Sequence, residues 1–473
     1  MALQLEADAA ENDVHDASIR PVTRPATLAI GGLVAMAMAV GIGRFVYTPI
    51  LPPMAEALAL SKGEAGLLAS ANFIGYLMGA LAATTSWFKD KPRRALLVFL
   101  ALSGATTAAM ALPDSLALLA ALRCLGGIAS AYVLVLSSAL VLERLARVGR
   151  SGLAALHFAG VGVGITVSAL LTWGLAAQGY GWRAMWLASG LVTFAGAALA
   201  SLLIPEAAPA QASARGVPGV SAAASDTAAL ARLSLAYGLF GFGYIITITF
   251  IVVIVRGSAE AVRFEPLFWL VIGLAASPSV ALWGALARRL GVTRAYAIAS
   301  LTLAAGVMAS VVSASLAALL LSAALVGATF MGVTSLGIMG ARSFAGADGA
   351  RWIAIATAAF GIGQIAGPIA AGYGYDLTGS FFLPSALTGS GLHAQTSRPG
   401  RGTSRGAVIR GAPRLALGER LSQGAAALRG LTTRTLPARG TLIMSLLRSP
   451  SAGRLRARTH PRWVGQVLGM VRA

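Results

Sequence analysis

The sequence predicts an all-α polytopic membrane protein, and three features support that prediction. Hydrophobic residues make up 57% of the 473 residues and charged residues only 11%, so the mean hydropathy is +0.76. Soluble domains usually carry roughly a quarter of charged residues. The apolar residues also come in blocks of about 18 to 25, the length of a helix that crosses a bilayer. One polar break divides these blocks into two sets.

About eleven apolar blocks have this length, six before the break and five after it. They predict helices at residues 27–51, 65–87, 95–112, 115–141, 152–177, 183–204, 231–255, 266–287, 293–313, 315–341 and 352–374. The break at 205–228 is rich in Ala, Ser and Pro and has no apolar face, which is typical of a flexible linker. We therefore expect a six-helix bundle at 25–204 and a second bundle, with five clear helices, at 229–380.

Basic residues gather in alternate loops between the predicted helices, and this pattern indicates the orientation. Lys and Arg accumulate on the cytoplasmic side of membrane proteins. The loops on one side carry Lys89, Lys91, Arg93, Arg94, Arg144, Arg147, Arg150, Arg288, Arg289, Arg294, Arg342 and Arg351. The N-terminus is predicted on that same, cytoplasmic side. Residues 1–24 are acidic and lack the basic start and short apolar core of a signal peptide, so they are expected to form a disordered cytoplasmic tail.

The sequence lacks the usual signals of an enzyme or a metal protein. Cys124 is the only cysteine, so neither an intrachain disulfide nor a thiolate cluster can form. No motif for nucleotide binding, metal ligation or a nucleophile with its base is present. We therefore predict that the protein is not an enzyme and needs no cofactor or metal.

The two halves share short sequence patterns. Residues 41–48 recur in form at 241–248, as expected for a protein built from repeats. The loop at 86–94, with Asp90, Arg93 and Arg94, is similar to the motif G-x-x-x-D-R-x-G-R-R of the major facilitator superfamily of transporters. The matching loop of the second half keeps Gly284, Arg289 and Gly291. In the family this loop latches helix ends, and a plain basic cytoplasmic loop is the alternative.

Three further segments carry the resemblance. Residues 119–127 are similar to L-x-x-x-R-x-x-Q-G, with Gly126 in place of Gln, and residues 363–372 resemble G-x-x-x-G-P-x-x-G-G, with Ala371 in place of a Gly. Residues 41–54 look like the opening of the bacterial YbfB-type branch. The resemblance covers roughly residues 27 to 380. It implies two six-helix bundles around a central cavity, and a secondary transporter of the bacterial inner membrane that works by alternating access.

Arg44 and Arg123 are the candidate substrate-binding charges, because both fall inside predicted spans. A charge in the hydrocarbon region costs about 2.5 to 3.5 kcal/mol on insertion scales, so it indicates function by default. Guanidinium groups grip carboxylates in a bidentate way, which favours an organic anion as substrate. The alternative is that these arginines bond to backbone carbonyls at bent helices. Neutral hydrogen-bonding candidates for the same cavity are Tyr47, Asn72, Tyr76, Tyr132, Tyr244, Thr247, Thr249 and Gln364.

His157 is the candidate proton relay. No Asp or Glu lies near the middle of a predicted span. A free imidazole titrates near neutral pH, which suits proton coupling. The alternative is a packing residue in an apolar helix.

Residues 381–473 do not follow the pattern of the preceding helices. Seven apolar residues at 381–387 are followed by Arg-rich sequence, and seven residues are too few to cross a bilayer. The twelfth helix is therefore expected to be missing or replaced by a basic low-complexity tail, either a frameshift product or a genuine tail that binds anionic lipids. About fourteen of the +20 net charges lie there, so the body is only mildly basic and nucleic-acid binding is not predicted.

Together these features predict that the protein binds a small-molecule substrate rather than a nucleic acid. We expect a monomeric transporter whose partners are the lipid bilayer and a small-molecule substrate. The alternatives are a membrane receptor or scaffold that does not transport, or an inactive truncated transporter.

Overall fold

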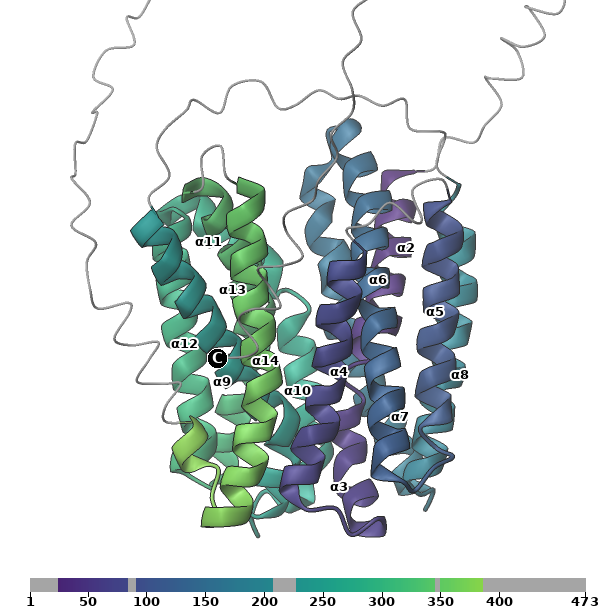
Figure 1. Ribbon diagram of the computed structural model, residues 1–473, viewed down its shortest axis with the longest axis vertical. Helices are drawn as coiled ribbons and strands as arrows, with labels where there is room; N and C mark the ends of the chain where they lie inside the picture. The colour runs from purple at the N-terminus through teal and green to yellow at the C-terminus, as the bar shows by residue number, and fades with distance from the viewer. Residues whose placement is uncertain (1–23, 84–90, 207–226, 345–348, 386–473) are drawn as a thin grey trace, which may run out of the picture. The chain divides into compact units, whose positions relative to one another are not determined.

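The computed structural model describes residues 24–83, 91–206, 227–344 and 349–385, and the regular structure in these ranges is entirely helical (Figure 1). The predicted all-α fold is therefore confirmed. Nearly all of the predicted N-terminal tail and linker, and the predicted basic tail beyond residue 385, lie outside the described residues.

The first half forms the helices that the six apolar blocks predict. They are α2 (Pro25–Met36), the π-helix η1 (Ala37–Ile42), α3 (Tyr47–Ala57), α4 (Lys62–Ala82), α5 (Pro92–Ala109), α6 (Leu116–Arg147), the short η2 (Ser151–Leu153), α7 (Ala154–Ala177) and α8 (Trp182–Leu203). The start of α4 has a clear local cause. The Ser61 hydroxyl accepts from the Glu64 amide at 3.1 Å, and the Glu64 carboxylate accepts from the Ser61 amide at 2.9 Å.

The second half follows the same plan. Its helices are α9 (Thr227–Arg256), the short η3 (Val262–Phe264), α10 (Glu265–Ala276), α11 (Ser279–Leu290), α12 (Val292–Val312), α13 (Leu316–Phe344) and α14 (Gly349–Thr378). The helix pair α10 and α11 replaces one predicted segment, and it is bent by 43°. Pro278 stands at this bend and has no amide hydrogen to continue the helix.

Nine stretches of the described residues are long and apolar enough to cross a membrane, or ten if the bent pair forms one span. Each predicted segment forms one or more helices within the described residues, but α5 is not among these spans. Its 18 residues have two arginines in the first turn and include Ser103, Thr106 and Thr107, which lower its hydropathy. The result is a polytopic membrane protein with one weakly apolar helix in its first half.

The first span is broken near its middle. The Gly43 amide donates to the Met38 carbonyl at 2.8 Å, a π-helical bond, and the chain turns through residues 43–46 before α3 begins. Pro49 has no amide hydrogen for the Phe45 carbonyl, and the Thr48 amide reaches that carbonyl instead at 3.2 Å. Such π-helical interruptions are frequently found at functional sites.

The halves meet along two helix pairs, α4 with α14 and α7 with α10. Small residues allow the close approach. A Cβ added at Gly66 on α4 would collide with the Pro368 carbonyl on α14, and one added at Gly162 on α7 would collide with the Ser277 amide just after α10. Of the glycines in the predicted motif at 363–372, Gly372 lies against α4 of the first half, whereas Gly363 and Gly367 lie against α9 of the second half.

The helices run between two ends of this assembly, which we name the Pro25 end and the Glu56 end. The Pro25 end holds the start of α2, the start of α5 and the end of α8, with Arg93 bonded to the Ile204 carbonyl. The Glu56 end holds the end of α3 and the start of α4. Figure 1 shows α2 and α3 at opposite ends of the same span.

Candidate functional site

A buried cationic site lies at the break between η1 and α3. Arg44 is 6% exposed. Its Nη2 atom donates to Oε1 of Gln364 on α14 at 3.4 Å, and Nε2 of Gln364 donates to the Tyr244 hydroxyl on α9 at 2.5 Å. The guanidinium carbon lies 4.1 Å from the ring centroid of Tyr76 and 4.5 Å from that of Phe73, both on α4. Four residues singled out in the sequence therefore converge here, from two helical spans of each half.

Arg123 on α6 supports the same break through the backbone. Its Nη2 atom donates to the Arg44 carbonyl at 3.2 Å and its Nε atom to the Leu68 carbonyl at 3.5 Å. Its guanidinium carbon lies 4.7 Å from the ring centroid of Tyr47, whose hydroxyl donates to the Ala65 carbonyl at 2.8 Å. The hydrogen bonds of Arg123 thus go to backbone carbonyls, one at the break and one within α4, whereas that of Arg44 goes to a side chain.

The described part of the chain offers these two arginines no buried counter-charge. Arg44 and Arg123 are its buried side chains that are charged at neutral pH. The ion pairs there involve other arginines, namely Arg93, Arg147, Arg183 and Arg256. The Nε atom of Arg44 is buried without a hydrogen-bond partner. A buried charge is costly unless it is paired, so this arrangement favours a negatively charged ligand.

Next to Arg44 lies a set of five aromatic side chains, which we call the aromatic cluster. Its members are Tyr237, Phe240 and Tyr244 on α9, Phe330 on α13 and Phe360 on α14. Sequence reasoning identified only Tyr244 among them. The spacing of four residues between Phe240 and Tyr244, and between Phe360 and Gln364, places each phenylalanine on the same helix face as a polar candidate. This four-residue spacing is the sequence feature that could have indicated Phe240 and Phe360.

The contacts of His157 are with residues other than Arg44 and Arg123. It is fully buried on α7, with Nε2 3.4 Å from the Ser138 hydroxyl of α6 and its ring packed edge-on against Phe158. Its Nδ1 atom is buried without a hydrogen-bond partner and faces Gly32 of α2. Its role as a proton relay stays a prediction.

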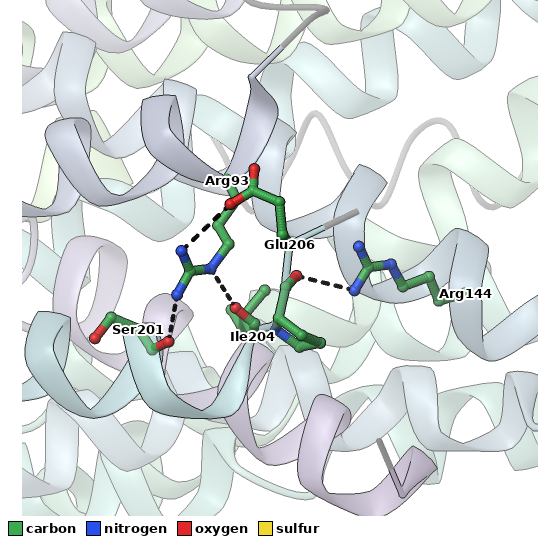
Figure 2. A network of polar contacts seen from close by, with 6 residues as sticks. Arg93, Arg144, Ser201, Ile204 and Glu206 are labelled. Carbon is green, nitrogen blue, oxygen red and sulfur yellow. Dashed lines mark hydrogen bonds and ion pairs between the residues drawn. The ribbon is translucent and has the colours of Figure 1, made fainter. Parts of the chain in front are cut away.

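The first copy of the loop motif contacts the end of α8 (Figure 2). The Arg93 side chain donates to the Ile204 and Ser201 carbonyls, each at 2.6 Å, and lies 3.4 Å from a Glu206 carboxylate oxygen. Arg144 of α6 donates to the Pro205 carbonyl at 3.1 Å. These bonds satisfy carbonyls that a helix end leaves free. Arg94 is exposed, and Asp90 lies outside the described residues.

The second copy of the motif forms the junction of α11 and α12. Gly291 has a φ of +84°, which favours glycine, and it separates the two helices. Gly284 lies within α11, and Arg289 is exposed near its end. The latch role of both copies stays a prediction.

The comparisons with known proteins agree with this geometry. The family described as "Uncharacterised MFS-type transporter YbfB" matches residues 36–395, which is more than half of the chain. The protein therefore belongs to this branch of the major facilitator superfamily of transporters. No curated protein sequence matches it.

Solved structures of transporters share the fold at low sequence identity. The nucleoside transporter NupG is similar with a TM-score of 0.57 and 14% identity over 79% of this chain and 99% of that chain, and its D323A mutant with 0.61 and 13% over 78% and 98%. A bacterial homologue of the human lysosomal transporter Spinster, inward-facing and unoccupied, has a TM-score of 0.55 and 17% identity over 79% and 93%. These likenesses establish the two-bundle transporter fold.

Proposed function

We propose that this protein is a secondary transporter that moves a small organic anion across the bacterial inner membrane by alternating access. The observation that carries the proposal is Arg44. This buried guanidinium lies at the junction of the two halves, and no buried carboxylate accompanies it in the described residues. A substrate carboxylate supplies the missing charge.

The chemistry of the site suits that ligand. The guanidinium of Arg44 has an unpartnered Nε donor, and its bond to Gln364 is long at 3.4 Å. A carboxylate accepts two parallel hydrogen bonds from such a fork and makes shorter, stronger bonds than a neutral amide. Arg44 belongs to the first half and Gln364 to the second. The affinity for a ligand held between them therefore depends on how the two halves are arranged. Alternating access requires this dependence.

Contacts at the Glu56 end support a closed state on that side. Arg256 on α9 donates to Glu56 on α3 at 2.5 Å, and the carboxylate of Asp376, in the last turn of α14, accepts from the amides of Lys62 and Gly63 on α4 at 3.0 and 2.7 Å. The Thr48 hydroxyl also donates to the Ile248 carbonyl at 2.8 Å. Each of these bonds joins the first half to the second, and each must break for the Glu56 end to open.

The basic loops indicate how the protein is oriented in the membrane. The Pro25 end carries Arg93 and Arg144, so the positive-inside rule places it in the cytoplasm. The Glu56 end then faces the periplasm, and the described state is shut on that side. We propose a monomer, because the site is formed within one chain.

The test is counterflow in liposomes that contain the purified full chain. An excess of unlabelled organic acid inside should drive accumulation of the labelled acid. Substituting Arg44→Gln removes the buried charge and should lower exchange about 100-fold, since losing one partner of a buried charged contact costs about 2 to 5 kcal/mol. Arg183→Gln is the matched control, because the Arg183 side chain is 43% exposed and pairs with Asp114 within the first half.

Two results would contradict the proposal. Exchange of sugars or cations that persists in Arg44→Gln would exclude an anion as the substrate. No counterflow of any solute by intact protein would favour the receptor or scaffold alternative.

A further inference from the structure

The aromatic cluster is joined directly to the cationic site. Tyr244 belongs to the cluster, and its hydroxyl accepts the hydrogen bond from Gln364, the same side chain that Arg44 contacts. Phe330 extends the connection, since its ring lies 6.1 Å from that of Phe45, the residue after Arg44. The charge and the rings therefore form one continuous site.

The rings of the cluster are close to parallel. Tyr244 is inclined by only 3° to Phe360 and 8° to Phe330, with centroids 6.0 and 5.7 Å apart. Phe240 and Tyr237 continue the arrangement within 28°. Aromatic residues make up only 7% of the chain, so five of them packed against one another is a local concentration. Parallel rings present flat faces that match another flat ring.

Unpartnered polar atoms indicate a ligand rather than a packed core. Arg44 Nε and Thr247 Oγ1 are both buried without a hydrogen-bond partner, in side chains that are 6% and 1% exposed. Thr247 follows Tyr244 by three residues on α9, on the same helix face. Buried donors and acceptors are normally satisfied, so both atoms point to a bound group.

The free hydrogen-bond donors of the two arginines indicate how many carboxylates the ligand carries. Two donors of Arg123 bond to the carbonyls of Arg44 and Leu68. Of these two arginines, Arg44 is the one with a buried donor that lacks a partner. One arginine fork binds one carboxylate, which favours a ligand with a single negative charge.

We propose that the transported anion is an aromatic monocarboxylate, a single flat ring whose carboxylate binds Arg44 and whose ring packs against Tyr244, Phe330 and Phe360. This inference rests on the proposed function and narrows it. A hydroxyl or amino group on the ring is the natural partner of Thr247. The neutral and cationic analogues of such a ligand leave the charge of Arg44 unpaired.

The test compares ligands that differ in one property, using thermal stabilisation of the purified full chain. Benzoate and cyclohexanecarboxylate carry the same charge and similar bulk, but only benzoate is flat and aromatic. Stacking adds about 0.5 to 1.5 kcal/mol beyond area burial, so benzoate should bind about 2- to 10-fold more tightly. Benzyl alcohol, with the ring and no charge, should not stabilise the protein.

A pair of variants locates the effect. Phe330→Leu should remove the preference for benzoate while cyclohexanecarboxylate binds as before. Phe250→Leu is the matched control, because Phe250 is equally buried but packs against Phe381 outside the cluster. It should keep the preference.

The outcomes separate the two proposals. Equal binding of benzoate and cyclohexanecarboxylate, with both lost in Arg44→Gln, overturns the aromatic inference and leaves an organic-anion transporter. A preference that survives Phe330→Leu also overturns it. If no carboxylate stabilises the protein, both proposals fail.

Discussion

Arg44 and Arg256 both lie where the two halves of the protein meet, and their surroundings are opposite. Arg256 is 30% exposed and pairs with two carboxylates, Glu56 at 2.5 Å and Glu265 at 2.6 Å. Arg44 is 6% exposed and has an amide and aromatic rings around it. The first arginine finds its counter-charge within the chain. The second does not find one among the described residues.

This difference assigns the two residues different tasks. The Arg256 pair with Glu56 joins the halves directly, so it stabilises one arrangement of the protein without a ligand. Arg44 has no counter-charge among the described residues, and we propose that a bound anion supplies it. A closing contact and a binding contact are thus distinguished by where the negative charge comes from.

Among the variants that test this difference between Arg44 and Arg256, Arg123→Met is expected to have the largest effect. This change removes the donors to the Arg44 and Leu68 carbonyls, which stay buried. An unsatisfied buried carbonyl costs about 1 to 3 kcal/mol, so we expect about 2 kcal/mol less stability and about tenfold weaker anion binding. Thermal unfolding with and without organic acid measures both quantities.

Arg183→Met is the control for Arg123→Met, because it also removes donors to backbone carbonyls, those of Ala111 and Leu112, but from a side chain that is 43% exposed. Arg123→Lys should recover part of the binding by restoring the charge. Unchanged stability and binding in Arg123→Met would mean that the broken helix holds its shape without Arg123.

A smaller effect is expected from Arg256→Gln, which removes both ion pairs at the Glu56 end. Partly exposed pairs are worth about 1 kcal/mol, so the closed arrangement should become about fivefold less favoured. A cavity of about 270 Å³ at this end is lined by Arg256 and Ala169. In a Cys124→Ser background, Ala169→Cys should react faster with a membrane-impermeant maleimide once Arg256 is replaced.

Arg183→Gln is the matched control for this experiment, since its partner Asp114 lies in the same half. Labelling should not change in that variant. Equal labelling with and without Arg256 would show that the pair does not hold the Glu56 end closed.

The smallest effect is expected at His157, which lies within the first half. The proton-relay hypothesis predicts that His157→Gln leaves transport active but removes its dependence on pH. Transport rates in liposomes at a series of pH values measure this. A profile that keeps its wild-type shape would reduce His157 to a packing residue against Ser138 and Gly32.

Much of the fold could be predicted because lipid imposes a strict length and polarity on each helix. Every predicted apolar block is helical, and the weak span α5 differs because of its arginines and hydroxyl side chains. The π-helical turn before Arg44 could not be predicted. It depends on how Gly41 packs against Gly164 and on the Arg123 bond, which are contacts between helices distant in sequence.

The site was predictable where a residue is out of place in lipid. Arg44 stands out as a charge inside an apolar span, and Gln364 stands out beside the glycines of α14. Phe330 and Phe360 do not stand out, because a phenylalanine in a membrane helix is ordinary. Their meeting at Tyr244 is set by the rotation and packing of three helices, which the local sequence does not encode.

The most direct test of the account supplies the missing charge from within the chain, by Gln364→Glu. Gln364 Oε1 already lies 3.4 Å from Arg44 Nη2, so the new carboxylate takes the place of the substrate. We predict that this variant unfolds at a higher temperature than the unliganded wild type and is no longer stabilised by organic acids. Gln364→Met, of similar size and without charge, should show neither change. If Gln364→Glu is destabilised and still binds organic acids as the wild type does, Arg44 does not need a bound anion. The proposed organic-anion site is then wrong.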